Sequence, residues 1–315
     1  MPGDSPIRAA VVGVGYLGAF HAQKYASLPG VELVAVVDAD RDRAEAIGRD
    51  VGAPAYTDVA DILGQVDCVS LAVPTTLHHP IAVVLLRNDI DLLVEKPITP
   101  TAAEGQELVG LAAERGRILQ VGHLERFNPA IRSLAGVISK PRFIECHRLA
   151  PFVERGTEVD VILDLMIHDL DIILSVVDGD VVSAEAVGVP VLSENVDIAN
   201  ARLRFSCGTI ANITASRVAL KRERKIRFFQ SDTYVAVDYG ERRIRILRRH
   251  ALEPGGGLPK IDMEEQSFDD ADPLFDEIEA FVGSVRTREK PLVDGATAVR
   301  VLELAERLRN GMETA

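Results

Sequence analysis

Apolar runs alternate with amphipathic stretches along the first 122 residues of the chain. The runs are continuous, which predicts strands that are buried on both faces. The stretches between them have helical spacing, and one opens with a capping box formed by Thr101 and Glu104. Strands that alternate with helices predict an α/β domain with a parallel, doubly wound sheet. We expect strands at 8–12, 31–37, 67–73, 90–94 and 118–121, and helices at 17–28, 41–51, 78–87 and 102–115.

The pattern changes after residue 122, where strand-like runs follow one another in series. In the run 198–205 every second residue is apolar, which predicts a strand with one buried face. Strands in series favour an α+β domain with a large, open and mainly antiparallel sheet. We therefore expect two domains, 1–122 and 123–315. The second should contain a helix at 161–177, strands at 181–189, 198–205, 209–217, 225–230, 234–237 and 243–247, and helices at 275–286 and 296–309.

A GxGxxG motif joins the first expected strand to the first expected helix. Gly13 allows a tight turn, Gly15 lets a pyrophosphate approach the backbone, and Gly18 permits close packing of helix on strand. The N-terminus of the helix supplies N–H groups and a positive dipole for the phosphates. We therefore expect a dinucleotide at a loop made of Gly13, Gly15, Tyr16, Leu17 and Gly18.

Asp38 ends the second expected strand, 20 residues beyond Gly18. A carboxylate at this place binds the ribose hydroxyls and repels a 2′-phosphate, so the sequence favours NAD over NADP as the cofactor. Arg41 lies close by in the sequence and keeps NADP open as the less favoured alternative.

A second motif, Glu95-Lys96-Pro97, follows the expected strand 90–94. Ligands of open parallel sheets bind at the carboxyl ends of the strands. A lysine there can hydrogen-bond a substrate hydroxyl, and its charge favours an alkoxide, whereas a surface ion pair with Glu95 is the alternative. Pro74, Thr75 and His78 follow the end of another expected strand, 67–73, and could line the same crevice. A histidine at the start of a helix is, however, more often structural. The expected crevice residues are Pro74, Thr75, His78, Glu95 and Lys96.

The stretch 161–177 predicts an apolar helix with one narrow polar arc. At 100° per residue, Asp164, His168 and Asp171 fall within about 60° of one another. Buried carboxylates and imidazoles are costly unless they are paired or face a wet cavity, so the arc is expected to face a ligand pocket. At i, i+4, Asp164 can orient the imidazole of His168 and make it a general base for a hydroxyl. Metal chelation by the pair, or a purely structural polar pair, are the alternatives.

Charge narrows the choice of partners. With 35 basic and 48 acidic residues the chain carries −13, which argues against broad binding to nucleic acid or to an anionic membrane. The charge is uneven, because residues 217–249 contain 11 basic and 4 acidic residues, a net +7 that leaves −20 elsewhere. Part of this tract is expected to be a solvated strand face, and the remainder favours an anionic substrate group such as a diphosphate.

Composition indicates a globular protein without metal or disulfide motifs. Hydrophobic residues make up 47% and charged residues 26%, which excludes wholesale disorder. The three cysteines are widely spaced, so we expect reduced thiols and no bound metal. The chain opens without a signal-peptide pattern, and its apolar runs are too short to span a bilayer, so a cytoplasmic location is expected.

Together these motifs resemble those of the Gfo/Idh/MocA oxidoreductases, from about residue 8 to beyond residue 217. The resemblance implies a Rossmann domain joined to an α/β domain whose open sheet mediates assembly of a homodimer or homotetramer. It also implies nicotinamide-dependent oxidation or reduction of a sugar or polyol hydroxyl. In this family Lys96, Asp164 and His168 would surround the reacting carbon. The matching motifs are the GxGxxG loop, Val-Val-Asp38, Pro74-Thr75-xx-His78, Glu95-Lys96-Pro97, Gly122-His123 and Asp164-xxx-His168.

A finer resemblance concerns the substrate. The segments 122–129 and 215–217 are similar to those of the branch that acts on the 3-hydroxyl of UDP-N-acetylhexosamines, such as UDP-N-acetylglucosamine or its uronate. Two alternatives stay open: an inositol or free-sugar dehydrogenase of the same family, and a non-catalytic NAD-binding regulatory protein. The substrate-binding residues that this resemblance implies are His123, Arg126, Asn128, Asp164 and Arg217.

Overall fold

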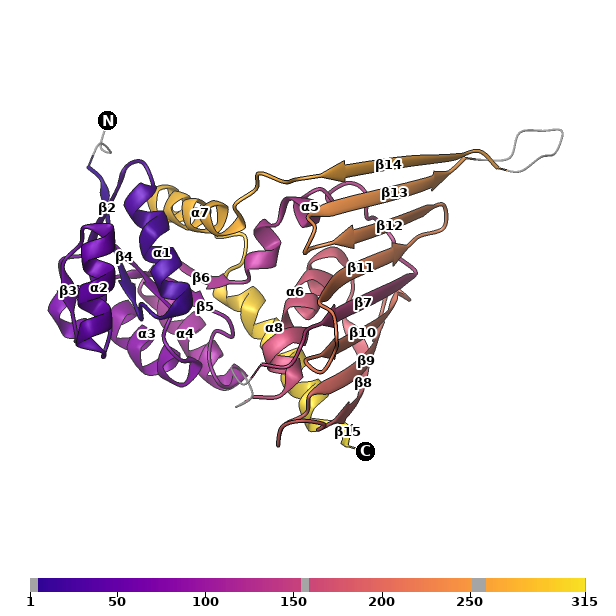
Figure 1. Cartoon of the computed structure of the whole chain (residues 1–315), viewed down its shortest axis with the longest axis horizontal. Coiled ribbons are helices and arrows are strands. Elements are labelled where there is room, and N and C mark those ends of the chain that lie inside the picture. The colour runs from indigo at the N-terminus through magenta and orange to yellow at the C-terminus, as the bar shows by residue number, and fades with distance from the viewer. Residues whose placement is uncertain (1–4, 154–158, 251–258, 315) are drawn as a thin grey trace. The chain divides into compact units, whose positions relative to one another are not determined.

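A computed structural model describes residues 5–153, 159–250 and 259–314 (Figure 1). They form two compact units. The first unit contains the chain through Leu124 together with Asp272–Leu302, and the second contains Glu125–Ala271 and the chain from Glu303 onward. The first junction lies close to the expected boundary after residue 122. The segment Asp272–Leu302 differs from expectation, because it returns to the first unit.

The first unit is built on a parallel sheet with the strand order β3-β2-β1-β4-β5-β6 over the described residues. Helix α1 contacts α2, and α3 contacts α4, so the helices cover the sheet in two layers. This order is that of a doubly wound Rossmann sheet, as the sequence predicts. The elements are β1 (Ile7–Val12), α1 (Tyr16–Ser27), β2 (Val31–Val37), α2 (Arg41–Val51), β3 (Ala55–Tyr56), β4 (Cys68–Leu71), α3 (His78–Arg87), β5 (Asp91–Glu95), α4 (Ala102–Glu114) and β6 (Leu119–Gly122).

Helix α7 (Pro273–Thr287) explains why the chain returns to the first unit. It contacts α1, and its residues Ile278 and Phe281 are buried in the same apolar core as Tyr25. Just after the helix, Arg288 donates a 3.0 Å hydrogen bond to Asp91 of β5. The apolar face of α7 thus completes the core of the Rossmann unit, which a boundary drawn along the sequence cannot show.

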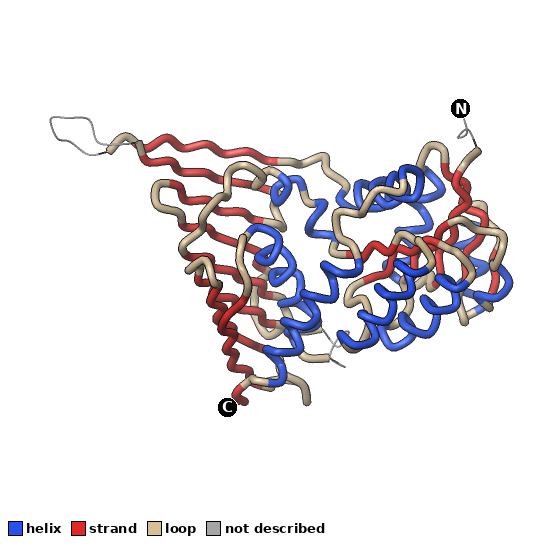
Figure 2. Tube along the Cα trace, turned by 180° about the vertical axis from the view of Figure 1, so that it is seen from behind, coloured by secondary structure: helices blue, strands red, loops and turns tan. Residues whose placement is uncertain are grey.

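The second unit is built on a large sheet with the order β14-β13-β12-β11-β7-β10-β9-β8-β15 over its described residues (Figure 2). Neighbouring strands are antiparallel except in the pairs β7–β10 and β8–β15, so the expected mainly antiparallel sheet is confirmed. The strands are β7 (Phe143–Leu149), β8 (Val181–Val189), β9 (Ile198–Phe205), β10 (Ile210–Ser216), β11 (Glu223–Phe229), β12 (Thr233–Asp238), β13 (Arg243–Arg249), β14 (Ile261–Ser267) and β15 (Glu313–Thr314).

Helices cover one face of this sheet, and the other face carries polar and aromatic residues. Ile144, Ala201 and Phe228 are fully buried on the covered face. The short helix α5 (Pro129–Arg132) contacts β12, and helix α8 (Gly295–Asn310) begins in the first unit and ends in the second.

The predicted helix 161–177 is present, but it is not uniform. Ile162–Met166 forms a π-helix, and α6 (Ile167–Val176) continues it. Asp160 caps the start by accepting hydrogen bonds of 3.0 and 3.1 Å from the N–H groups of Ile162 and Leu163. A π-helix has i→i+5 hydrogen bonds and turns by less than 100° per residue. The even spacing assumed for Asp164 along the arc is therefore wrong at the start of this helix.

Candidate active site

The glycine loop after β1 has a geometry that only glycine tolerates. Gly13 has a φ of +84°, and a Cβ atom there would lie 2.7 Å from the backbone nitrogen of Val73. A Cβ atom on Gly18 would lie 1.8 Å from the carbonyl oxygen of Gly13. At Gly15 the nearest atom to a Cβ would be 3.8 Å away, on Arg43, so this side of the loop is open. The three glycines thus serve the tight turn, the close packing and the open approach expected of a dinucleotide loop.

The first turn of α1 presents partial positive charge. Its N-cap, Gly15, provides no side-chain hydrogen bond, and the turn contains no acidic residue. The N–H groups at such a helix start, with the helix dipole, favour phosphate groups. Tyr16 and Leu17 lie in this turn with 66% and 37% of their surface exposed. The residues present therefore fit the pyrophosphate of a dinucleotide.

Asp38 anchors the glycine loop from the end of β2. Its carboxylate accepts 2.9 Å hydrogen bonds from the N–H groups of Val14 and Asp40. Each carboxylate oxygen can accept further hydrogen bonds. This anchoring therefore leaves the predicted contact with the ribose hydroxyls available.

Arg43 is the arginine next to the loop. Its guanidinium lies 3.8 Å from the carboxylate of Asp38 and 2.8 Å from that of Asp40. Arg41, which the sequence analysis selected, lies 3.9 Å from Glu45 one helical turn along α2. Both arginines belong to the first turn of α2, and the sequence alone does not tell which one points toward the loop.

His78 supports the loop that follows β4. Its ring is almost fully buried, with Nδ1 2.9 Å from the carbonyl oxygen of Pro97 and Nε2 2.9 Å from that of Val73. Burial lowers the pKa of His78 despite these two acceptors. The ring thereby ties the loop of Pro74 and Thr75 to the Glu-Lys-Pro motif, and the predicted cofactor contact of His78 stays a prediction.

The Glu-Lys-Pro motif stands at the end of β5. The backbone N–H of Lys96 donates a 3.2 Å hydrogen bond to the carboxylate of Glu95, and Glu95 also lies 3.0 Å from Nε2 of His21 on α1. Burial raises the pKa of Glu95, but the hydrogen bond from His21 and the nearby charge of Lys96 outweigh it, so the pKa lies below its ordinary value. Glu95 is therefore held as a carboxylate beside Lys96.

The sheet brings the predicted cofactor residues of the first unit to one edge. The strands β1, β2, β4, β5 and β6 run parallel, so Gly13, Asp38, Lys96 and the other residues that follow these strands share the carboxyl edge. His123 comes directly after β6 at this edge, with 1% of its surface exposed. This is where open α/β sheets bind their ligands.

In the second unit the candidate base and its partner lie on the π-helix and α6. Asp164 lies in the π-helix and His168 in the first turn of α6, and both are half-buried. π-Helical turns occur frequently at functional sites. The hydrogen bond expected between Asp164 and His168 stays a prediction.

Asp169 also lies on α6, outside the polar arc of Asp164, His168 and Asp171, and it has a partner of its own. Its carboxylate is fully buried and accepts hydrogen bonds of 2.8 and 3.0 Å from the guanidinium of Arg148 on β7. Arg148 also donates a 3.2 Å hydrogen bond to Glu125, and its guanidinium lies 5.3 Å from the ring centroid of Tyr239. Burial opposes the charge of Arg148, but Asp169 and Glu125 outweigh it and raise the pKa of the guanidinium. This pair fastens α6 to the sheet.

Arg126 is the predicted substrate-binding arginine that the structure brings to the same helix. Its guanidinium donates a 3.3 Å hydrogen bond to Asp171, three residues beyond His168. The side chain of Arg126 keeps 14% of its surface exposed, whereas that of Asp171 keeps 1%. Arg126, His168 and Asp164 are thus candidate groups of one site in the second unit.

Asn128 and Arg217 have structural partners instead. The side-chain oxygen of Asn128 caps α5 by accepting a 3.1 Å hydrogen bond from the N–H of Ala130. Arg217 is 3% exposed and donates a 2.8 Å hydrogen bond to Asp197 and another to the carbonyl oxygen of Val159. These contacts hold loops around the helix start, and the predicted substrate contacts of both residues stay predictions.

Other observations concern metals and membranes. Within the described ranges, no cluster of three or more His, Cys, Asp or Glu side chains has a geometry suited to a metal ion. No helix in that part of the chain combines the length and the apolar character needed to cross a membrane.

Comparisons with known proteins agree with this arrangement. The profile of an oxidoreductase family with an NAD-binding Rossmann fold, GFO/IDH/MocA, matches residues 7–123, and that of the GFO/IDH/MocA C-terminal domain matches residues 131–236. The UDP-N-acetylglucosamine 3-dehydrogenase of Acidithiobacillus ferrooxidans is 38% identical over 309 residues, which are 98% of this chain and 97% of that enzyme. A solved structure of that enzyme has a TM-score of 0.91 at 36% identity over 98% of each chain.

An inositol dehydrogenase is also similar. The scyllo-inositol 2-dehydrogenase (NAD(+)) of Bacillus subtilis is 30% identical over 237 residues, 69% of each chain. Its similarity thus extends over less of the chain than that of the nucleotide-sugar enzyme.

Proposed function

Because the chain belongs to the GFO/IDH/MocA family of NAD-binding oxidoreductases, we propose that it oxidises the C3 hydroxyl of a UDP-N-acetylhexosamine, with UDP-N-acetylglucosamine as the first candidate. The observation that supports this choice of substrate is the near full-length likeness to a UDP-N-acetylglucosamine 3-dehydrogenase. The enzyme class, a dehydrogenase that uses NAD and acts on a sugar hydroxyl, follows from the same likeness and from the family.

The first unit supplies the groups that would hold the cofactor. The open side of Gly15 and the positive start of α1 suit the pyrophosphate, and Asp38 suits the ribose hydroxyls. When bound, NAD supplies the hydride acceptor, C4 of its nicotinamide ring. The carboxylate of Asp38 opposes a 2′-phosphate, while Arg43 beside it is neutralised by Asp38 and Asp40, which supports NAD over NADP.

Three side chains would act on the substrate. In the proposed mechanism His168 takes the proton of the hydroxyl, and Asp164 orients its imidazole and stabilises the imidazolium that forms. The ammonium of Lys96 hydrogen-bonds the same oxygen and lowers the cost of the developing negative charge. The carboxylate of Glu95 keeps Lys96 positively charged for this task. Arg126 and His123 are proposed to contact the nucleotide sugar.

A ligand panel tests the substrate. We expect NAD to raise the unfolding temperature, and UDP-N-acetylglucosamine to raise it further in the presence of NADH, because a ligand at 100 times its Kd stabilises the fold by about 2.7 kcal/mol. Free hexoses should leave it unchanged at the same concentration. NADH formation, followed by absorbance, should occur with the UDP-sugar.

Other outcomes of the panel would change the assignment. Turnover of inositol without binding of any UDP-sugar would replace the proposal with the inositol alternative, which the 30% identity over 69% of the chain supports. Binding of NAD with no NADH formation across all sugars would favour the non-catalytic alternative.

We propose that the uncovered face of the large sheet joins two copies of the chain. Strand register places apolar side chains from six neighbouring strands in one row across this face. The ring centroids of Phe143 and Phe229 lie 5.6 Å apart, and those of Phe229 and Tyr234 lie 5.1 Å apart. A row this apolar on an exposed sheet face is typical of an interface. The row consists of Ile210, Phe143, Phe229, Tyr234, Leu247 and Met263.

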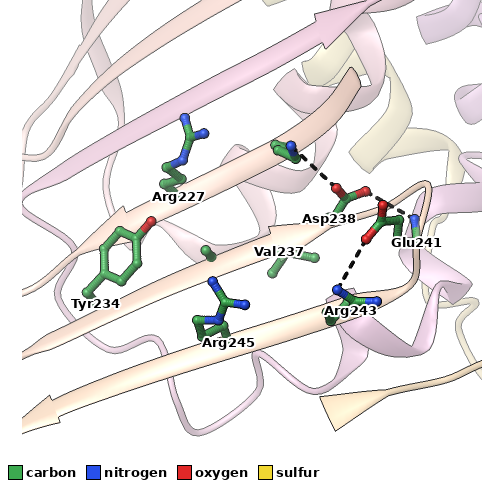
Figure 3. Close-up of a pocket in the computed structure, with 9 residues that line it drawn as sticks. Arg227, Tyr234, Val237, Asp238, Glu241, Arg243 and Arg245 are labelled. Carbon is green, nitrogen blue, oxygen red and sulfur yellow. Dashed lines mark hydrogen bonds and ion pairs between the residues drawn. The ribbon is translucent and has the colours of Figure 1, made fainter. Parts of the chain in front are cut away.

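Charges next to the apolar row suit a second copy rather than an anionic ligand. Arg227 pairs with Glu145 at 2.7 Å, and Arg245 with Glu265 at 2.9 Å. Figure 3 shows the hollow that Arg227, Tyr234 and Arg245 line on this face, together with Asp238, Glu241 and Arg243. Because both signs of charge are present, the face can complement itself across a twofold axis. Part of the excess positive charge of residues 217–249 is thus neutralised by Glu145, Glu264 and Glu265 of the same sheet.

A single charge in the row tests the assembly. We expect Tyr234→Arg to convert the wild-type oligomer to monomer in sedimentation velocity, because an unpaired guanidinium would be buried in the interface. Leu220→Arg is the matched control, since Leu220 is 99% exposed outside the strands and the same charge there should leave the oligomer intact. A monomeric wild-type chain, or an unchanged mass for Tyr234→Arg, would contradict the interface.

A further inference from the structure

A chain of hydrogen bonds leads from the interior of the first unit to the Glu-Lys-Pro motif. The hydroxyl of Tyr25 lies 2.9 Å from that of Ser70, which lies 3.1 Å from Nδ1 of His21. Nε2 of His21 lies 3.0 Å from a carboxylate oxygen of Glu95. Tyr25, Ser70 and His21 are each fully buried. A neutral His21 with its proton on Nε2 donates to Glu95 and accepts from Ser70. Each hydrogen bond in the chain then has one donor and one acceptor.

A second buried carboxyl group shares this interior, and its oxygens have no hydrogen-bond partner among the residues that the structure describes. Glu277 on α7 is 0% exposed, and neither of its carboxyl oxygens is hydrogen-bonded within the described structure. Gln120 on β6 is also fully buried, and it donates a 3.2 Å hydrogen bond to the backbone oxygen of Glu277 while its own side-chain oxygen is unpaired. An ionised carboxylate in such a place would be very costly. A protonated carboxyl group of Glu277, in contrast, can donate a hydrogen bond, and the side-chain oxygen of Gln120 can accept one.

Glu95 is fixed in position as well as hydrogen-bonded. It faces Gly122 across the pair β5–β6, and a Cβ atom on Gly122 would lie 3.1 Å from the carboxyl atoms of Glu95. The absence of a side chain at Gly122 thus leaves the space that the carboxylate occupies. The same carboxylate accepts the backbone N–H of Lys96, so its charge lies directly beside that residue.

We propose that Glu95 and Glu277 share a single proton, and that His21 is the positioning residue that keeps the proton on Glu277 and the negative charge on Glu95. Lys96 then stays an ammonium group held beside a carboxylate. The inference rests on the proposed role of Lys96 in oxidation of the substrate. Nothing else in the chain's proposed chemistry uses His21 or Glu277.

The charges around the two carboxyl groups are consistent with this division. Burial and the charge of Glu95 raise the pKa of Glu277 well above its ordinary value. Burial also opposes the charged form of Glu95, but the interactions with His21 and Lys96 together outweigh it and lower the pKa of Glu95. Burial raises the pKa of the neighbouring Tyr25 and Cys68 and lowers that of His78, which faces the charge of Glu95, so all three groups are neutral. Two like charges in one buried site cannot both form at moderate cost, so one carboxyl group stays protonated.

Infrared spectroscopy tests the shared proton without any turnover. We expect the wild-type protein at neutral pH to show the carbonyl band of a buried, protonated carboxylic acid, and Glu277→Gln to lose it. Glu279→Gln, on the exposed side of the same helix, is the matched control and should keep the band. Absence of the band from the wild type, or its survival in Glu277→Gln, would overturn the proposal.

Two substitutions at one position test the role of His21. A glutamine amide reaches the place of Nε2 and can still donate to Glu95, whereas an asparagine amide reaches only the place of Nδ1. We expect His21→Gln to behave like the wild type. His21→Asn should raise the pH at which Glu95 takes up a proton by about 1 to 3 units, because Glu95 loses the donor that favours its charged form. The acidic limb of the kcat profile, which the general base sets in the wild type, should then steepen and move upward.

A double substitution separates positioning from mere packing. Adding Glu277→Gln to His21→Asn removes the competing carboxyl group, so Glu95 should ionise more readily and the acidic limb should move back toward the wild-type pH. A structural defect at His21 would not be rescued in this way, and equal pH profiles for all variants would overturn the positioning role. If UDP-sugars proved not to be substrates, the infrared band would still decide the shared proton, and the profiles would be measured on the sugar that is turned over.

Discussion

Replacing His168 by alanine is expected to lower kcat by about 10²–10⁴-fold, the usual contribution of a general base. In the proposed mechanism the imidazole is the group that takes the proton of the hydroxyl, and alanine leaves no group at this place to do so. The Kd for NAD should stay unchanged, because the glycine loop and Asp38 belong to the other unit. Single-turnover NADH formation and NAD titration measure the two quantities separately.

Matched variants show whether the effect is specific. Lys96→Ala should also abolish turnover while NAD still binds, because the oxygen loses its stabilising charge. Ser175→Ala is the control on the same helix, since Ser175 is exposed and its hydroxyl only caps the backbone oxygen of Ile172. Full turnover in His168→Ala or Lys96→Ala would remove that residue from the mechanism.

Asp169→Ala is expected to destabilise the fold by about 3–5 kcal/mol, because it leaves the guanidinium of Arg148 buried without its bidentate partner. The loss should appear as a lower midpoint in urea unfolding with an unchanged slope. Glu45→Ala provides the comparison, since Glu45 pairs with Arg41 at 3.9 Å and with Arg49 at 4.0 Å on the surface of α2, and such pairs contribute about 0–1 kcal/mol.

A double replacement distinguishes two causes of this loss of stability, the loss of the ion pair itself and the unpaired charge left on Arg148. Replacing Arg148 by methionine and Asp169 by leucine removes both charges while keeping similar volume, and the protein should recover most of the lost stability. If Asp169→Ala alone unfolds no more easily than Glu45→Ala, Arg148 is satisfied by Glu125, and the pair does not fasten α6 to the sheet.

The parts of the fold that repeat a simple period could be predicted from the sequence. The strands of the first unit follow continuous apolar runs, and the glycine loop follows from three residues whose lack of a side chain has a direct steric reason. The strand β9 could be predicted because its polar and apolar residues alternate, and its apolar side is indeed buried. In each case one local property decides the structure.

Features that depend on distant partners could not be predicted. Strand β7 contains Arg148 on its buried face, which hides the alternation until Asp169 is seen to pair with it. Strand β14 is exposed along its whole length and exists through its pairing with β13. Two candidate site residues were missed because only the fold brings them to the site. His21 contacts Glu95, and Arg43 lies next to the glycine loop. The signal available for His21 was its place on α1, one turn beyond Gly18.

The return of α7 to the Rossmann unit has a consequence for how the chain can be divided. The polypeptide passes from one unit to the other three times, after Leu124, Ala271 and Leu302. A fragment that stops at Leu124 would lack α7 and leave bare the apolar surface of α1 that Phe281 covers. The chain up to Leu124 is therefore not an autonomous building block, and a fusion at that boundary alone would divide the core of the Rossmann unit.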